Sequence, residues 1–242
     1  MLAAVSDAPG FVRDAGGGWR FEGWASPRVR AGLTDRTVDP SWLVGQQPSA
    51  LVEAEQVHGA GIAVLEGTRA PAGPISGCDG LLTSVPGMAL RIRTADCLPI
   101  FFADPERLIV GLAHAGWRGL AAQLPVRMVA AFRHAYHSPV SALHVAIGPA
   151  IRSCCYEVGP EFQALFGPHV RTDGQRRMCD LIGVAIEQLL GCGVPRERIT
   201  DSGCCTACDA ERWFSLRREG PMTGRLISFV LVKAEDAAPR PA

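Results

Sequence analysis

The chain has 242 residues, of which 48% are apolar and 20% charged, so it can bury a sizeable core and is neither disordered nor fibrous. Its 24 basic and 24 acidic residues cancel, which leaves no general attraction to nucleic acid or to an anionic membrane surface. The longest apolar runs, such as Leu226–Val232, are too short to cross a bilayer, and Met1–Gly10 lacks the basic start of a signal peptide, so we expect a cytoplasmic protein with neither a nucleic-acid nor a membrane partner.

The predicted elements begin after two segments, residues 1–30 and 38–50, whose glycines and prolines indicate loops. Apolar runs predict strands at Ile62–Leu65, Met88–Ile92, Ile100–Ala103, Leu108–Ala113, Leu143–Ile147 and Arg225–Val232. Gly119–Tyr136 predicts a helix because apolar residues recur every four positions, and Pro125 is tolerated only if it lies in the first turn. Asp180–Leu190 predicts a second helix, which ends at Gly191. Strands and helices that mix without strict alternation favour an α+β fold in one domain, with a frayed tail at Ala237–Ala242.

Three polar segments interrupt this apolar pattern and are the candidates for chemistry. They are Glu55–Gly59 before a strand, Thr94–Pro99 between two strands, and Ala113–Gly119 where a strand leads into a helix. Unpaired N–H groups at a helix start favour anions, and the guanidinium of Arg118 adds a forked donor for phosphate or carboxylate.

One histidine, one cysteine and another histidine stand in these segments, namely His58, Cys97 and His114. Each of them alone is more often a structural residue than a ligand. Together, two imidazoles and one thiolate are the donor set of a catalytic zinc site, which keeps a fourth position open. They lie 39 and 17 residues apart, so only the fold can bring them together.

Nine cysteines in a chain of this length favour reduced thiols over a disulfide framework. The run Cys204-Cys205-x-x-Cys208 has the spacing of half a zinc site. Its best partner in the sequence, Cys154-Cys155, is a poor one because adjacent ligands are strained, so we expect incidental or buried thiols here.

The ordered motifs of the chain resemble the laccase-domain or polyphenol-oxidase-like family, whose members are described as multifunctional purine nucleoside phosphorylases and adenosine deaminases. The matching segments are Gln56–Gly59, Cys78–Thr83, Thr94–Pro99, Ala113–Gly119, Ile147–Pro149, Cys155–Gly159, Cys205–Thr206 and Phe214–Arg218. The run His-Ala-Gly-Trp-Arg-Gly together with Ala-Asp-Cys is highly specific.

This resemblance implies a single-domain layered α/β sandwich with mixed sheets, similar to the fold of a Cys–His toxin deamidase. It also implies zinc held by His58, Cys97 and His114, with copper as the alternative metal. The implied substrates are inorganic phosphate and the purine nucleosides adenosine, inosine, guanosine and methylthioadenosine, with deamination of adenosine as a second activity.

The N-terminal part departs from the family pattern. Ala31–Arg36 is similar to a degenerate form of the family's Gly-Phe-Ser-Thr-Arg segment, and only 19 residues separate Arg36 from Gln56. The chain also lacks asparagine, so the family's asparagine-containing stretches are missing. We expect a lost helix here, with residues 1–54 a degenerate N-terminal part, 55–232 the family core, and 1–242 one domain.

The residues suggest roles for the two reactions. Asp96, next to Cys97, is a candidate to shuttle a proton during deamination, in which a metal-activated water attacks C6 of adenine; a structural hydrogen bond is the equal alternative. Arg118, and also Arg36, are candidates to hold phosphate. Trp117 is more typical of core packing than of purine stacking. Arg217 and Arg218 could approach the site or cover the protein surface, and we favour the surface.

Three other functions remain open on the residues alone. Cysteine and histidine also suit copper, as in a polyphenol oxidase. Cys97 with His114 or His58 could serve a metal-free Cys–His hydrolase. The shortened N-terminal part is compatible with a non-enzymatic accessory protein. The sequence does not give the preferred nucleoside or the oligomeric state.

Overall fold

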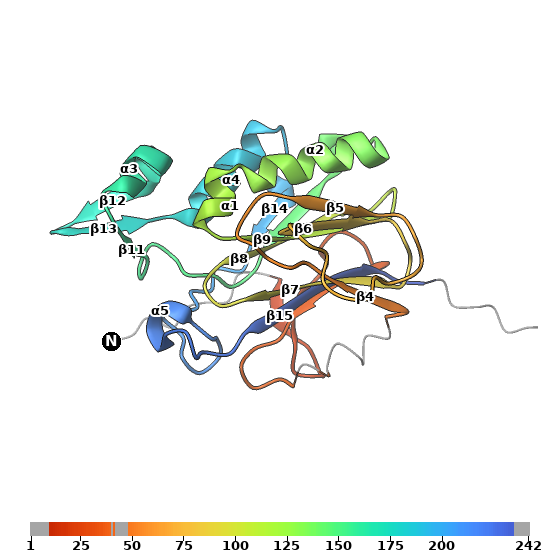
Figure 1. Cartoon of the computed structure of the whole chain (residues 1–242), viewed down its shortest axis with the longest axis horizontal. Helices are drawn as coiled ribbons and strands as arrows, with labels where there is room; N and C mark the ends of the chain where they lie inside the picture. Colours follow the sequence, from red (N-terminus) through yellow and green to blue (C-terminus); the bar gives the residue numbers. More distant parts are fainter. Residues whose placement is uncertain (1–9, 40, 42–47, 235–242) are drawn as a thin grey trace, which may run out of the picture.

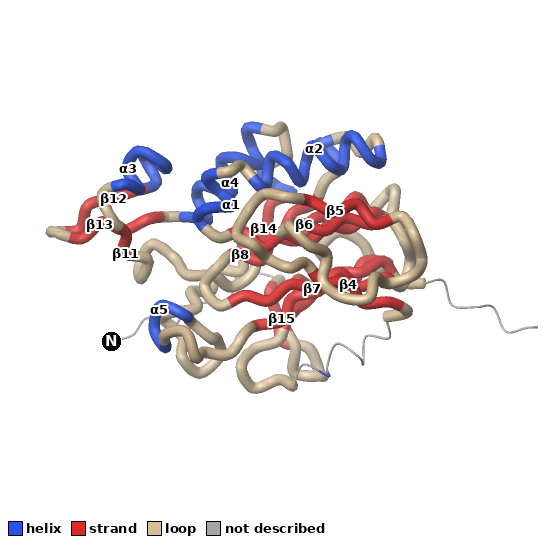
Figure 2. The backbone as a smooth tube through the Cα atoms, viewed as in Figure 1, coloured by secondary structure: helices blue, strands red, loops and turns tan. Residues whose placement is uncertain are grey.

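Two β-sheets stacked face to face form the body of the molecule, and helices cover the outer face of one of them (Figure 1). The structure is a computed structural model that describes residues 10–39, 41 and 48–234. A third, small sheet projects to one side together with α3 (Figure 2).

The strands of the described residues fall into three sheets. The first has the order β1-β2-β3-β15-β7-β4, comprising β1 (Phe11–Arg13), β2 (Trp19–Phe21), β3 (Val29–Leu33), β15 (Leu226–Val232), β7 (Met88–Thr94) and β4 (Ala50–Glu53). The second has the order β14-β10-β8-β9-β6-β5, comprising β14 (Ile199–Asp201), β10 (His144–Ile147), β8 (Leu98–Asp104), β9 (Ile109–Ala115), β6 (Gly80–Thr83) and β5 (Ile62–Leu65). The third joins β11 (Glu157–Val158), β13 (Arg176–Cys179) and β12 (Val170–Asp173).

Both large sheets are mixed. The pairs β4–β7, β5–β6 and β10–β14 are parallel, whereas the other pairs are antiparallel. The helices are α1 (Trp117–Ala121), α2 (Leu124–Tyr136), α3 (Glu161–Phe166), α4 (Leu181–Gly191) and α5 (Leu216–Glu219). The mixed sheets of one layered domain confirm the predicted fold class.

The second sheet lies in the middle, so its central strands β8 and β9 are buried on both faces. In β8, Phe101 packs into the core between the two sheets, while its neighbour Phe102 packs into the core under the helices. Successive side chains of a strand point to opposite faces, and every residue of β8 and β9 is therefore buried. This explains the continuous apolar runs of these strands.

The predicted helix over Gly119–Tyr136 is two helices in the structure. It breaks at Gln123, whose φ of 59° is left-handed, and α2 restarts with Pro125 in its first turn. Proline has no N–H to donate to the preceding turn and its ring clashes with that turn, so a continuous helix through Pro125 would cost about 3 kcal/mol or more. The expectation for Pro125 is confirmed, and the single helix is wrong.

The N-terminal residues form strands rather than the expected loops. Phe11, Trp19 and Phe21 of β1 and β2 are buried in the core between the sheets. Phe11 and Trp19 pack against Trp213, and Phe21 packs against Phe11. Strands of three residues between glycine-rich turns carry too short a pattern to be seen in the sequence. Part of the segment of the predicted lost helix, and the predicted frayed tail, lie outside the described residues.

No helix in the described part of the chain has the length and apolar character needed to span a membrane.

Candidate metal centre and pocket

Strand register places Cys97 beside His114. In the antiparallel pair β8–β9, Pro99 faces His114 and Leu98 faces Ala115, so Cys97 lies at the end of β9 where the chain turns into α1. Gly116 occupies this turn because a Cβ there would lie 3.1 Å from the Cys97 sulfur. Two residues that are distant in sequence thus meet at one end of the sheet.

His58 arrives from the loop that follows β4. The Gln56 side chain fixes this loop, because its amide bonds the backbone of Arg93 in β7 at 2.6 and 2.8 Å. Gln56 and His58 both have left-handed φ angles, 65° and 60°, which are uncommon for residues with a side chain. The turn directs the His58 ring edge-on against His114, at 4.8 Å between ring centroids.

The three predicted ligands converge. A ligand atom from each of His58, Cys97 and His114 lies within 4.8 Å of the others. His58 is exposed and His114 is buried, so the group opens to solvent on one side only. Two imidazoles and a thiol this close match the donor chemistry of a zinc site with one open position.

Asp79 holds two of these ligands in place, and sequence reasoning did not single it out. Its fully buried carboxylate accepts from the backbone N–H groups of His58 and Gly59 at 3.0 and 2.7 Å, and Oδ1 lies 2.8 Å from His114 Nδ1. Burial opposes the charged form of Asp79, but these hydrogen bonds outweigh it and its pKa is lowered. Asp79 stands in the motif Cys78-Asp79-Gly80, which gave the only sequence signal for this role.

Protonation in the metal-free protein favours a thiolate beside an imidazolium. Burial raises the pKa of Cys97, but hydrogen bonds with His114 and His58 outweigh it and bring that pKa to about 7. Burial lowers the pKa of His114, but Asp79 and Cys97 outweigh it and raise that pKa to about 9. A cation placed among these groups would therefore meet a ready thiolate.

A cavity of about 400 Å³ is lined by two of the three ligands, His58 and Cys97, and its volume lies within the usual size range of small-molecule sites. Two arginines line it, Arg118 from α1 and Arg217 from α5, and both are exposed. The other lining residues are Ala95, Asp96, Gly116, Trp117, Ile151, Tyr156, Leu181 and Leu216. The cavity thus combines a positive rim with an apolar floor.

Each arginine lies over an aromatic ring of the cavity wall. The Arg118 guanidinium is 4.2 Å from the centroid of Trp117, and that of Arg217 is 5.1 Å from the centroid of Tyr156. Trp117 also packs on Phe162, which agrees with its expected packing role. Arg217 is exposed, as the sequence reasoning favoured, and it also lines the cavity.

Asp96 lines the cavity, but both of its carboxylate oxygens are engaged. Oδ1 accepts from the Thr206 hydroxyl at 2.6 Å, and Oδ2 accepts from the backbone N–H of Arg217 at 2.7 Å. With φ at 86°, Asp96 closes the turn that leads to Cys97. These contacts tie the turn to the C-terminal segment and favour the structural alternative for this residue.

Arg36 is not brought to the cavity. Its guanidinium pairs with Glu219 at 3.1 Å, bonds the carbonyl of Ala210, and lies over the Phe214 ring. Arg36 is not among the residues that line the cavity.

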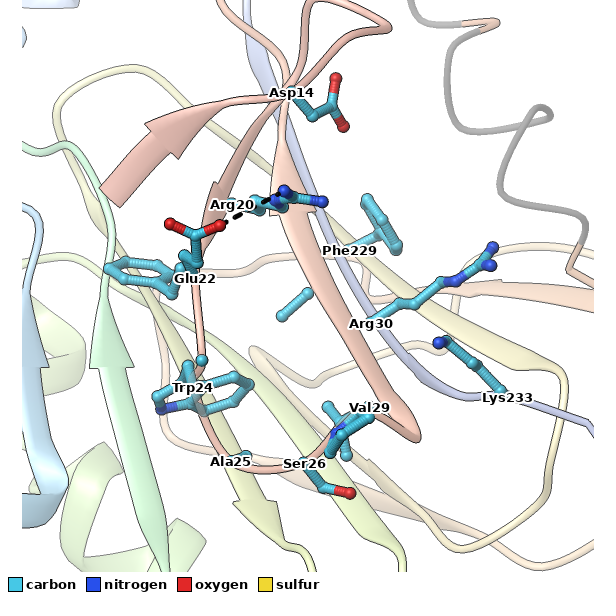
Figure 3. A pocket seen from close by; sticks show the side chains of 14 residues that line it. Asp14, Arg20, Glu22, Trp24, Ala25, Ser26, Val29, Arg30, Phe229 and Lys233 are labelled. Atoms are coloured by element: carbon cyan, nitrogen blue, oxygen red, sulfur yellow. Dashed lines mark ion pairs between the residues drawn. The ribbon is translucent and has the colours of Figure 1, made fainter. Parts of the chain in front are cut away.

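A larger cavity of about 650 Å³ lies against the first sheet (Figure 3). Its polar residues include Arg20, which pairs with Glu22, together with Arg30 and Lys233. It is lined by neither histidine nor cysteine, and so offers no site for the predicted chemistry.

Comparison with known proteins gives a consistent result. Residues 40–233 match the family described as multi-copper polyphenol oxidoreductase laccase. The chain is 38% identical over 191 residues to the purine nucleoside phosphorylase YlmD of Geobacillus stearothermophilus, covering 73% of this chain and 70% of that protein. It is 31% identical over 216 residues to the adenosine deaminase RL5 of an unknown prokaryotic organism, covering 83% of this chain and 82% of that protein. The crystal structure of the Geobacillus YlmD superposes with a TM-score of 0.86 at 30% identity, covering 93% of this chain and 99% of that one.

Proposed function

Because this chain belongs to the family described as multi-copper polyphenol oxidoreductase laccase, we propose that it is a zinc-dependent purine nucleoside phosphorylase that also deaminates adenosine. The proposed substrates are inorganic phosphate with adenosine, inosine, guanosine or methylthioadenosine. The observation that carries the proposal is the convergence of His58, Cys97 and His114 beside a cavity rimmed by two arginines.

The residues fit a zinc ion. His58, Cys97 and His114 would hold it, and Asp79 would keep His114 in the tautomer whose Nε2 faces the ion. When bound, zinc supplies a Lewis acid and lowers the pKa of water in its open position. One thiolate and two neutral imidazoles leave the site with a net charge near +1, which also favours an anionic substrate.

Phosphorolysis requires an anion close to the sugar. Phosphate forms a bond to C1′ while the bond from C1′ to the purine nitrogen breaks, and the purine leaves with a proton. Arg118 is the first candidate to hold phosphate, because it lines the cavity and has a forked donor geometry. Arg217 lines the same cavity and is the second candidate.

The apolar floor suits a purine ring. Ile151 and Leu181 are buried there, and Leu216 adds an exposed apolar side chain. Burial raises the pKa of Tyr156 to about 12, so its phenol stays protonated near neutral pH and can donate a hydrogen bond to the leaving base. Asp96 is assigned to positioning, because it already accepts two hydrogen bonds.

The direct test is an assay of the zinc-loaded protein with each nucleoside, with and without inorganic phosphate. We expect free base and ribose 1-phosphate from inosine only when phosphate is present. We expect inosine and ammonia from adenosine in the absence of phosphate. Zinc-loaded protein that converts none of the nucleosides in either condition would point instead to an accessory protein without catalytic function.

A second candidate function, a Cys–His hydrolase without metal, is favoured by one observation. Asp79, His114 and Cys97 form a chain of carboxylate, imidazole and thiol, in which the pKa of Cys97 is about 7. This is the arrangement of an activated cysteine nucleophile. Acyl substrates should then label Cys97 in protein stripped of metal, whereas the zinc proposal expects no turnover in that state.

The copper oxidase remains the third possibility, because the family description names it. Full reduction of oxygen takes four electrons, and the described residues contain one mixed histidine and cysteine group. Phenol oxidation by the copper-loaded protein, absent with zinc, is the result that would favour it. The nine cysteines are free, which fits the proposed cytoplasmic location.

A further inference from the structure

Four cysteine sulfurs gather in a second group, which shares no residue with the first. The Sγ atoms of Cys154, Cys155, Cys205 and Cys208 all lie within 4.8 Å of one another. Cys208 is the centre of the group, at 3.3 Å from Cys155 and 3.5 Å from Cys154. The sequence expectation of incidental thiols, based on strain between the adjacent Cys154 and Cys155, does not describe this arrangement.

The backbone brings the two segments together before any side chain is considered. Ala150 forms a parallel bridge with Cys205, in which Ala150 donates to the Cys204 carbonyl at 3.3 Å and Thr206 donates to the Ala150 carbonyl at 3.0 Å. The chain after Ala150 then turns back, with Cys155 donating to the Arg152 carbonyl at 2.9 Å. This turn allows two adjacent cysteines to face the same point.

The Cys205 sulfur is already in the setting of a metal-bound thiolate. Backbone N–H groups of Arg152, Ala207 and Cys208 donate to it. Two residues separate Cys205 from Cys208, which is the spacing found in zinc-binding turns. The Arg152 guanidinium pairs with Asp201 through two hydrogen bonds, at 2.9 and 2.7 Å, and also interacts electrostatically with Cys205.

The separations fit one ion rather than a cluster. Four thiolates at about 2.3 Å from a tetrahedral zinc ion lie about 3.8 Å from one another. The observed distances of 3.3 and 3.5 Å, and the 4.8 Å limit for the whole group, surround that value. An iron–sulfur cluster places inorganic sulfide and several irons between its ligands, and needs cysteines that lie farther apart.

We propose that Cys154, Cys155, Cys205 and Cys208 bind a structural zinc ion, separate from the His58–Cys97–His114 centre. A four-thiolate site has no position left for a reactant, so this ion has no catalytic step. Its binding free energy adds to the folding free energy of the two segments, because the unfolded chain does not hold the four sulfurs together.

The second ion braces the wall of the cavity described above. Thr206, which lies between Cys205 and Cys208, donates to Asp96, and its carbonyl accepts from Arg218 at 2.6 Å. On the other segment, Tyr156 follows Cys155 directly and lines the cavity. Losing this zinc should therefore loosen both walls while leaving the catalytic ligands in place.

The test is metal counting on the full chain, purified with reductant after expression in zinc-supplemented medium. We expect two zinc ions per chain in the wild type, one in Cys208→Ser and one in Cys97→Ser. Cys208 is exposed, so this substitution leaves the core intact. Cys192→Ser, at a half-buried cysteine outside both groups, is the matched control and should retain two.

A cobalt titration of the wild type provides a check that needs no variant. Two tetrahedral cobalt centres are expected, and the one with the stronger sulfur-to-metal charge-transfer bands should disappear in Cys208→Ser. The proposal is overturned if the wild type holds one zinc and Cys208→Ser still holds one. Iron in the four-cysteine site, or a disulfide from Cys208 to Cys154 or Cys155 in the zinc-supplemented protein, would overturn it as well. None of these readouts depends on nucleoside turnover.

Discussion

Replacing Asp79 by asparagine tests how this protein prepares its metal ligands. The fully buried carboxylate accepts from three groups, the backbone N–H of His58, the backbone N–H of Gly59 and the Nδ1 of His114. Asparagine has almost the same shape, but only one of its two terminal atoms can accept. In one orientation its amide N–H₂ faces the buried Nδ1 of His114 and the part-buried N–H of His58, and in the other it faces the part-buried N–H of Gly59.

The expected losses of stability and of zinc affinity follow from these contacts. Leaving a buried donor unsatisfied costs about 1–3 kcal/mol of stability. Removing a carboxylate that orients a metal-bound histidine typically weakens metal affinity by about 10–100-fold, or about 1.4–2.7 kcal/mol. We therefore expect Asp79→Asn to lower both the free energy of unfolding and the zinc affinity of the catalytic centre.

A second buried carboxylate separates the two effects. Asp35 accepts from Trp19 at 3.0 Å and from the Thr37 backbone and hydroxyl at 2.8 and 2.7 Å, and it pairs with Arg13 at 3.2 Å. It belongs to neither group of candidate metal ligands. Asp35→Asn should lower stability by a similar amount and leave zinc affinity unchanged. Zinc affinity is measured by competition with a chelator, and stability by urea unfolding of the metal-free protein. Equal zinc affinities for Asp79→Asn and the wild type would refute the assigned role.

Three further outcomes are expected. In metal-free protein, the rate of Cys97 alkylation by iodoacetamide should rise with pH about a midpoint near 7, because the depressed pKa lets the thiolate form there. His114→Ala should move this midpoint toward the ordinary thiol value of 9.0. A midpoint that is unchanged in the variant would contradict the thiolate–imidazolium pair. Arg118→Gln should raise the KM for phosphate by about 10-fold or more, because a charge-assisted contact to phosphate is lost. Arg36→Gln, at a matched arginine outside the cavity lining, should leave that KM within about twofold. Initial rates at varied phosphate concentration measure both values, and equal effects of the two variants would contradict the role of Arg118 in phosphate binding. Asp96→Asn should lower the kcat of adenosine deamination by less than about 10-fold, because the asparagine side chain can keep the hydrogen bonds to Thr206 and to the Arg217 backbone. A loss of about 10²–10⁴-fold would instead support Asp96 as the proton shuttle.

The sequence pattern predicted the parts of the fold that repeat over several residues. Ile62–Leu65 is a strand with the predicted bounds, and β7 and β8 extend the predicted runs by two or three residues. The strands β9 and β15 each start one residue later than predicted, and β9 ends two residues later. The short strands β1 and β2 were missed because three residues between turns show no period. The break at Gln123 was missed because apolar spacing continues across it.

The metal ligands were found by residue type and by resemblance, whereas their convergence is a property of strand register and of the turn at His58. Asp79 was not assigned because an acidic residue before a strand carries no period and no spacing that marks its partner. The sequence reasoning set aside Cys154-Cys155 as partners of Cys205 and Cys208, because adjacent ligands are strained. In the structure, the bridge between Ala150 and Cys205 brings the two segments together. Contacts of this kind depend on the tertiary fold and leave no local signal.

The most direct measurement pairs zinc content with turnover of inosine, in the wild type and in Cys97→Ser. The account predicts that the substitution removes one zinc ion from each chain and, with it, the phosphate-dependent release of hypoxanthine. A variant that still releases hypoxanthine at the wild-type rate would contradict the claim that a thiolate and two imidazoles together hold the reactive centre.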